Sequence, residues 1–183
     1  QNLILLDLPS EHADAAASRL AAIGLHVHPS IFRTGTIACT GTQFCKLAQT
    51  ETKARADELI SYLETALPEF RSPLRISVTG CPNSCAHYQI CDIGLVGDFL
   101  NTTDGKVEAF RVYLGGHLGE GYKFGRKLKR KIVATEIKHY VEEISRGFVN
   151  GRISEAESFQ DYIARHTTEE LEALAPCTRA AAI

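Results

Sequence analysis

The chain has 183 residues, of which 44% are hydrophobic and 23% are charged, as in ordinary soluble globular proteins. Its formal net charge of −2 at pH 7 argues against a general nucleic-acid binder. No apolar run approaches the roughly 18 residues of a membrane span, and no secretory signal pattern follows Gln1, so we expect a cytoplasmic location. There is no methionine. We therefore expect either a removed start or a piece of a longer chain.

The first thirty residues predict one strand and one helix. Residues 3–6 are an apolar run bounded by Pro9, which predicts a buried strand. Ser10 is a typical N-cap, and an alanine-rich helix is expected over residues 11–23, with Gly24 as its stop. Such a strand–helix unit is too small to be a domain of its own.

The middle of the chain places two cysteine pairs after predicted strands. Residues 36–38 read as a strand that leads into Cys39. A helix is expected from about residue 44 to 66, with Leu47, Leu59, Leu63 and Leu67 as core contacts. This interpretation puts Cys45 near a helix N-terminus, where the helix dipole stabilises thiolate. Residues 74–78 alternate like a strand and lead into Cys81.

The rest of the chain predicts a hairpin followed by helices. Residues 92–100 and 107–114 should pair as a β-hairpin, with Asp104-Gly105 as its turn signal. Thr135 is expected to cap a helix ending near Phe148, and helical patches follow at 154–165 and 168–174. The predicted fold class is α+β.

The cysteine spacing is typical of an iron–sulfur site. Five residues separate Cys39 from Cys45, thirty-five separate Cys45 from Cys81, and three separate Cys81 from Cys85. Four thiolates in two close pairs can each hold one iron corner of a cubane. Zinc knuckles usually have two to four residues between cysteines, and disulfides need an oxidising compartment. Both stay open as alternatives.

The residues around the thiols resemble the signatures of the sirohaem-dependent nitrite and sulfite reductases. The second pair lies in Thr-Gly-Cys-Pro-Asn-Ser-Cys (79–85), followed by Asp-Ile-Gly-Leu (92–95). The first pair, in Ala-Cys-Thr-Gly (38–41) and Gln-Phe-Cys (43–45), with Glu-Thr-Lys-Ala-Arg-Ala (51–56), is similar to the ferredoxin-dependent nitrite reductase branch. Gly115-Gly116 resembles a further family stretch. The resemblance runs from about residue 1 to 140 and covers only the C-terminal part of such an enzyme.

This resemblance implies a site and an architecture. Cys39, Cys45, Cys81 and Cys85 would ligate a [4Fe-4S] cluster, and Cys85 would also bridge to the sirohaem iron. The implied fold is the C-terminal half of a nitrite/sulfite reductase, a mixed sheet with flanking helices. Residues 1–30 would be part of a ferredoxin-like half-domain, 31–150 the cluster and sirohaem domain, and 151–183 a helical tail.

Other residues near the thiols have two interpretations each. Asn83, between two ligands, could hydrogen-bond them or only make the turn. Gly41 and Gly80 allow backbone amides close to sulfur, which tunes a cluster's potential, or they form ordinary turns. Cys91 and Cys177 are expected to be incidental free thiols.

A dense run of basic residues follows Gly115-Gly116 in the sequence. Most such runs are solvated surface, but small ferredoxins are usually acidic, so a basic face could dock one as the electron donor. The run contains Lys123, Arg126, Lys127, Lys129, Arg130 and Lys131. The resemblance implies six-electron reduction of nitrite to ammonia with ferredoxin. Sulfite reduction to sulfide and a non-catalytic iron–sulfur module remain the alternatives.

Overall fold

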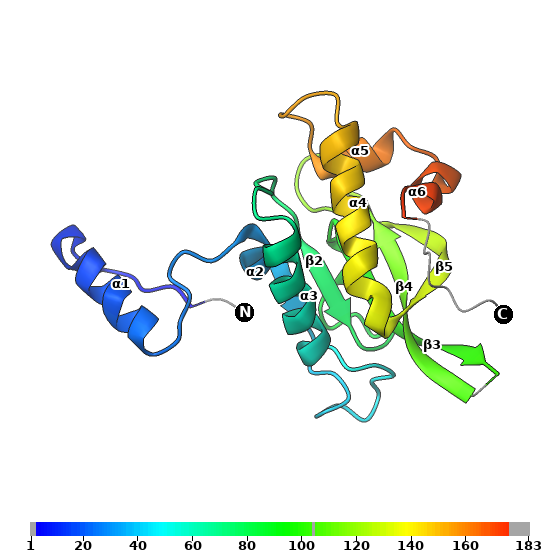
Figure 1. Cartoon of the computed structure of the whole chain (residues 1–183), viewed down its shortest axis with the longest axis horizontal. Coiled ribbons are helices and arrows are strands. Elements are labelled where there is room, and N and C mark those ends of the chain that lie inside the picture. The colour runs from blue at the N-terminus through cyan, green and yellow to red at the C-terminus, as the bar shows by residue number, and fades with distance from the viewer. Residues whose placement is uncertain (1–2, 104, 176–183) are drawn as a thin grey trace.

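The computed structural model describes residues 3–103 and 105–175. Two layers form its body, a five-stranded sheet and a pair of long helices packed on one face (Figure 1). In chain order the elements are η1 (Ser10–His12), α1 (Ala13–Ala22), α2 (Ile31–Gly35), β1 (Thr36–Ala38), α3 (Lys53–Ala66), β2 (Ile76–Thr79), η2 (Tyr88–Ile90), β3 (Ile93–Thr102), β4 (Gly105–Leu114), β5 (Arg126–Val133), η3 (Ala134–Glu136), α4 (Ile137–Gly151), α5 (Phe159–Ala164) and α6 (Thr168–Leu174).

The sheet is mixed, and its strands lie in sequence order from β1 to β5. β1, β2 and β3 are parallel, whereas β3, β4 and β5 are antiparallel. The β3–β4 hairpin pairs as far as Thr102 with Gly105, so its turn is tighter than the predicted six-residue turn. Asp104, half of the predicted turn signal, lies outside the described residues. The α+β class is as predicted.

The core lies between the sheet and helices α3 and α4. In α4, six buried side chains recur at the three- and four-residue spacing of a helix with one apolar face. They are Ile137, Tyr140, Val141, Ile144, Ser145 and Phe148. α5 and α6 add Phe159, Tyr162 and Leu171 to the same core. Thr167 begins α6 with a full capping box, its hydroxyl accepting from Glu170 N–H. Thr135 makes no side-chain cap for α4.

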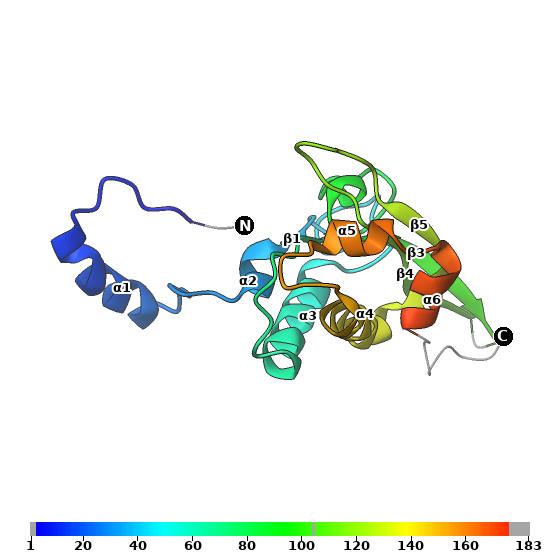
Figure 2. The ribbon, with the colours of Figure 1, turned by 90° about the horizontal axis from the view of Figure 1, so that it is seen from above.

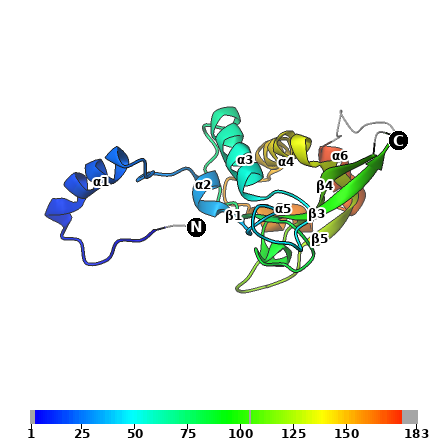
Figure 3. The ribbon, with the colours of Figure 1, turned by 90° about the horizontal axis from the view of Figure 1, so that it is seen from below.

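On the opposite face of the sheet, none of the described residues forms a long helix. Figures 2 and 3 show α3 and α4 on one side and, on the other, η2 together with the segment 115–125. Successive residues of a strand point to opposite faces. Val78 and Leu95 therefore enter the helix-covered core, while Ser77 and Gly94 face η2.

The N-terminal arm differs from the prediction. Residues 3–6 form no strand, and Leu3 and Leu6 are 70% and 78% exposed. A strand needs a hydrogen-bonded neighbour, and none of the described residues provides one here. The predicted helix exists as η1 and α1, without a side-chain cap from Ser10, and it buries no residue. Figure 1 shows α1 standing away from the body.

The predicted helix from residue 44 was wrong in its first half. α3 begins only at Lys53, and residues 44–52 form turns and irregular backbone. Leu59, Leu63 and Leu67 are buried as expected, but Leu47 is exposed. No helix among the described residues is long and apolar enough to cross a membrane.

Candidate metal centre

Two neighbouring parallel strands bring the two cysteine pairs to the same edge of the sheet. Ala38 at the end of β1 pairs with Val78 of β2, and Cys39 N–H then donates to Val78 O at 3.0 Å. Since β1 and β2 are parallel, the loops that follow them start side by side. The carboxyl end of a parallel sheet is where open α/β sheets bind their ligands.

The Cys39 sulfur has polar neighbours from both sides. Gly80 N–H donates to Cys39 Sγ at 3.2 Å, which confirms that this glycine brings an amide to sulfur. Thr52 Oγ1 lies 3.8 Å from the same sulfur and donates to Cys39 O at 2.7 Å. A Cβ at Gly80 would lie 3.0 Å from Thr50 O, closer than ordinary packing allows. Glycine is therefore needed where the two loops meet.

The first cysteine loop is a compact turn. Cys45 N–H donates to Gly41 O at 3.0 Å, and Gly41 has the positive φ of +72° that favours glycine. Gln49 N–H donates to Gly80 O at 2.7 Å and ties this loop to the second one. Cys45 is half-buried and lies eight residues before α3, so the predicted helix-dipole stabilisation of its thiolate was wrong.

Glu51 connects the first loop to α3. Its carboxylate accepts from Thr42 Oγ1 at 3.0 Å and from the N–H groups of Lys53 and Ala54 at 2.9 and 3.2 Å. Burial raises the pKa of Glu51, but these hydrogen bonds outweigh it and leave the pKa below its ordinary value. Glu51 thus caps the helix and holds the loop. A carboxylate just before a helix is a sequence signal that could have predicted this role.

The second cysteine loop lies on the sheet face opposite the helices. Cys81 is buried, whereas Cys85 is exposed. Ser77 Oγ donates to Ala86 O at 2.6 Å and anchors the end of the loop on β2. Asn83 is exposed and has no hydrogen bond within the described part of the chain. Its contact with bound ligands stays a prediction.

The glycine-rich segment 115–125 packs against the chain that follows Cys85. Gly116 N–H donates to Cys91 O at 3.1 Å, and Gly125 N–H donates to Gln89 O at 2.7 Å. The Tyr88 and Tyr113 rings contact each other, with centroids 4.8 Å apart and planes tilted by 53°. This segment, which includes the Gly115-Gly116 stretch, therefore lies on the same face of the sheet as the second cysteine loop (Figure 2).

Two buried acidic groups lie next to each other behind this loop. Burial raises the pKa of the Cys91 thiol, which donates to His87 O at 3.5 Å. Burial also raises the pKa of Asp92, whose carboxylate accepts from Arg75 N–H at 2.6 Å and from the Gln160 amide. A buried thiol with a raised pKa is a poor nucleophile and ligand. Cys91 is free, as are all the described cysteines, so its expected role as an incidental thiol stays a prediction, and Cys177 lies outside the described residues.

The donors at this edge fit an iron–sulfur cluster. The described cysteines are all free, and no three His, Cys, Asp or Glu side chains within residues 3–103 and 105–175 could hold one metal ion. The ligands of a cubane lie farther apart than those of a single ion, because each thiolate binds its own iron corner of the cluster. Gln49 Oε1 is buried beside the loops without a partner in the described chain. The Gly80 amide already points at one sulfur, as cluster ligation favours.

The fold separates the basic run into two groups, because three of its six side chains make hydrogen bonds or ion pairs within the protein. The engaged pairs are Arg126 with His166 O at 2.5 Å, Lys129 with Glu169 at 2.9 Å and Lys131 with Asp98 at 2.8 Å. Lys123, Lys127 and Arg130 are exposed and have no side-chain partner in the described part of the chain. Lys127 pairs across the sheet with Tyr113, so it points to the face that carries the second cysteine loop.

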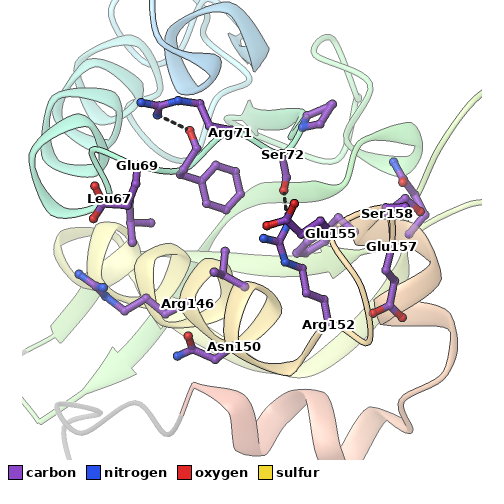
Figure 4. Close-up of a pocket in the computed structure, with 16 residues that line it drawn as sticks. Leu67, Glu69, Arg71, Ser72, Arg146, Asn150, Arg152, Glu155, Glu157 and Ser158 are labelled. Carbon is purple, nitrogen blue, oxygen red and sulfur yellow. Dashed lines mark hydrogen bonds between the residues drawn. The ribbon is translucent and has the colours of Figure 1, made fainter.

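A cavity of about 920 Å³ lies elsewhere, at the C-terminal ends of α3 and α4 (Figure 4). Arg71, Arg146 and Arg152 line it, and each already donates to an oxygen of the protein. The cysteine loops lie at the other end of α3, a helix of 14 residues that is about 21 Å long. This cavity is therefore separate from the cysteine site.

Comparison with known proteins identifies the family. The model of the nitrite and sulphite reductase 4Fe-4S domain matches residues 33–176. The chain belongs to this family. The resemblance seen in the cysteine motifs is thereby confirmed, and membership implies a [4Fe-4S] cluster and sirohaem.

Two kinds of relatives match the chain. "Sulfite reductase [ferredoxin] 1" of Mycolicibacterium paratuberculosis is 40% identical over 177 residues, covering 93% of this chain and 32% of that protein. The chloroplastic ferredoxin–nitrite reductase of Arabidopsis thaliana is 41% identical over 117 residues, covering 63% of this chain and 20% of that protein. The chain thus spans about a third or less of the relatives' length.

Solved structures confirm the fold. The Mycobacterium tuberculosis NirA protein matches with a TM-score of 0.85 and 40% identity over 91% of this chain and 31% of its own. Dissimilatory sulfite reductase I matches with a TM-score of 0.60 at 13% identity, which supports the fold alone. The predicted nitrite/sulfite reductase-like α+β fold is confirmed.

Proposed function

We propose that this chain is the cluster-bearing C-terminal region of a ferredoxin-dependent sirohaem reductase. The observation that supports this most is the hydrogen bond from Gly80 N–H to Cys39 Sγ, which joins the two cysteine loops. The match to the 4Fe-4S domain family agrees with it. Cys39, Cys45, Cys81 and Cys85 are the proposed cluster ligands. Cys85 would also hold the sirohaem, and its exposed position suits contact with a group outside this chain.

The proposed substrate is sulfite or nitrite. Sulfite to sulfide takes sulfur from +4 to −2, and nitrite to ammonia takes nitrogen from +3 to −3, so each needs six electrons. The cluster and sirohaem, when bound, supply this electron transfer at one centre. The motif around Gln43 favours nitrite, whereas the relatives that cover 93% of the chain are named sulfite reductases. The fuller coverage leads us to place sulfite first and nitrite second.

An assay of the complete, cofactor-loaded protein tests this function. With reduced ferredoxin and either sulfite or nitrite, we expect sulfide or ammonia at six electrons per product. The ratio of the two kcat/KM values then assigns the substrate. A coloured, redox-active protein that forms neither product would instead be a non-catalytic electron-transfer module.

The proposed donor is ferredoxin, bound in part by the unpaired cations of the basic run. Double charge reversal, Lys127→Glu with Arg130→Glu, is expected to lower ferredoxin-driven kcat/KM on the order of tenfold at low salt, because rim charges steer association. Added salt should shrink the difference, since it screens exposed charges. Turnover with reduced viologen should be unchanged.

Lys106→Glu, which changes an exposed cation at the hairpin tip, is the matched control. Equal losses with both donors would place these residues in the fold or at the cofactors.

The exposed apolar surface of the N-terminal arm supports the proposal that this chain is part of a larger protein. Its apolar side chains Leu3, Ile4 and Leu6 are exposed, and a cavity of about 730 Å³ separates the arm from β1 and α3. We propose that residues 1–30 are part of a ferredoxin-like half-domain completed by further chain. Residues 31–150 form the cluster domain and 151–183 a C-terminal tail, whose helices α5 and α6 pack on the core of that domain. A cytoplasmic location is part of the same proposal.

A further inference from the structure

One threonine sits between the glycines of both cysteine loops. Thr52 is fully buried at the start of α3. A Cβ at Gly41, in the first loop, would lie 2.6 Å from Thr52 Oγ1, and a Cβ at Gly80, in the second loop, would lie 3.2 Å from Thr52 Cγ2. The hydroxyl is therefore held against one loop and the methyl group against the other. Its side chain makes no helix-capping hydrogen bond, so the hydroxyl is not used by α3.

The hydroxyl of Thr52 lies within reach of two acceptors on Cys39. It donates its one proton to Cys39 O at 2.7 Å, and Cys39 Sγ lies 3.8 Å from Oγ1, within hydrogen-bond reach of sulfur. As a thiol, Cys39 can itself donate to Thr52 Oγ1. A ligating cysteine is a thiolate without that proton, so its sulfur can only accept. The single Thr52 proton is then shared between Cys39 O and Cys39 Sγ in a bifurcated hydrogen bond, and Gly80 N–H is the second donor beside this sulfur.

We propose that Thr52 is a positioning residue for Cys39 and that its hydroxyl raises the reduction potential of the cluster. The inference rests on the proposed function. Donors near a cluster sulfur stabilise negative charge, and reduction adds one electron to the cluster, so the reduced state gains more than the oxidised state. The same hydroxyl holds the Cys39 carbonyl, which fixes the backbone from which the sulfur projects.

The test compares variants of the complete, cofactor-loaded protein by redox titration followed by electron paramagnetic resonance. Thr52→Val removes the hydroxyl and keeps the shape. At the potential where half of the wild-type cluster is reduced, the ratio of reduced to oxidised cluster in this variant should be lower on the order of tenfold. For a one-electron couple, this corresponds to a midpoint potential lower by ~59 mV. Thr52→Ser keeps the hydroxyl and should keep the wild-type potential. Thr52→Ala removes the hydroxyl without filling the gap, so it substitutes for Thr52→Val if that variant does not fold.

Thr36→Val is the matched control. Thr36 is a buried threonine on β1, three residues before Cys39, and its hydroxyl has no partner among the described residues. This variant should leave the midpoint unchanged. An unchanged midpoint in Thr52→Val and Thr52→Ala, or an equal shift in Thr52→Ser or Thr36→Val, would overturn the inference and leave the proposed function standing. A wild-type protein with no iron and no labile sulfide would overturn both.

Discussion

Serine in place of any one cluster cysteine should abolish stable retention of a four-iron cluster. The four positions are Cys39, Cys45, Cys81 and Cys85. Each thiolate holds one iron corner, and a serine hydroxyl stays protonated at neutral pH, so one corner loses its ligand. After anaerobic reconstitution we expect iron and labile sulfide to fall on the order of tenfold relative to the wild type, with the secondary structure retained. Elemental analysis and circular dichroism measure the two quantities.

The remaining cysteines provide the control for this series. Cys91→Ser should keep the cluster, because the Cys91 thiol is buried and engaged with His87 O. Cys177→Ser should keep it as well. Loss of the cluster in either variant, with the fold intact, would mean that the ligand set is wrong. Full retention after substitution of Cys45 or Cys85 would have the same meaning.

The 183-residue chain alone should show no sulfite or nitrite reductase activity. Sirohaem carries eight carboxylates, and burying them requires matching arginine and lysine side chains. On the cysteine-loop face, Arg111 and Lys131 already pair with Asp98 and, despite its burial, hold the pKa of that carboxyl far below its usual range. Arg55 pairs with Glu58. The unpaired cations named above, Lys123, Lys127 and Arg130, are too few to match eight carboxylates.

The measurement for this second prediction is titration of reconstituted chain with sirohaem, followed by a viologen-driven assay. We expect weak or no binding and turnover at least about a hundredfold below that of a complete enzyme, since misplaced reacting groups alone cost that much. The complete enzyme, assayed in parallel, is the control. Robust turnover by the short chain would show that the proposed missing half is not required for catalysis.

Local signals predicted the elements that the structure confirms. The helices predicted up to Phe148 and over 168–174 are present as α4 and α6, because helix-forming signals act within a few residues of the chain. The predicted helix over 44–52 fails for a long-range reason. Gln49 donates to Gly80 O, and a Cβ at Gly97 would meet Thr50 Oγ1, so tertiary contacts override local helix propensity.

The candidate site was only partly predictable. The cysteine spacing and motifs led to the proposed ligands, but the role of Thr52 depends on a contact made across thirteen residues and on the β1–β2 register. The division of the basic run also depends on tertiary structure, because α6 provides Glu169 and β3 provides Asp98. Sequence reasoning treats such a run as one patch, whereas strand pairing distributes its side chains between the two faces.

The most direct test of the central claim is the iron and acid-labile sulfide content of anaerobically reconstituted wild-type protein, measured together with its visible absorption. A [4Fe-4S] cluster on the two cysteine loops predicts about four iron atoms and about four sulfides per chain, with a brown absorption shoulder. One zinc per chain, with no labile sulfide and no colour, would contradict the account.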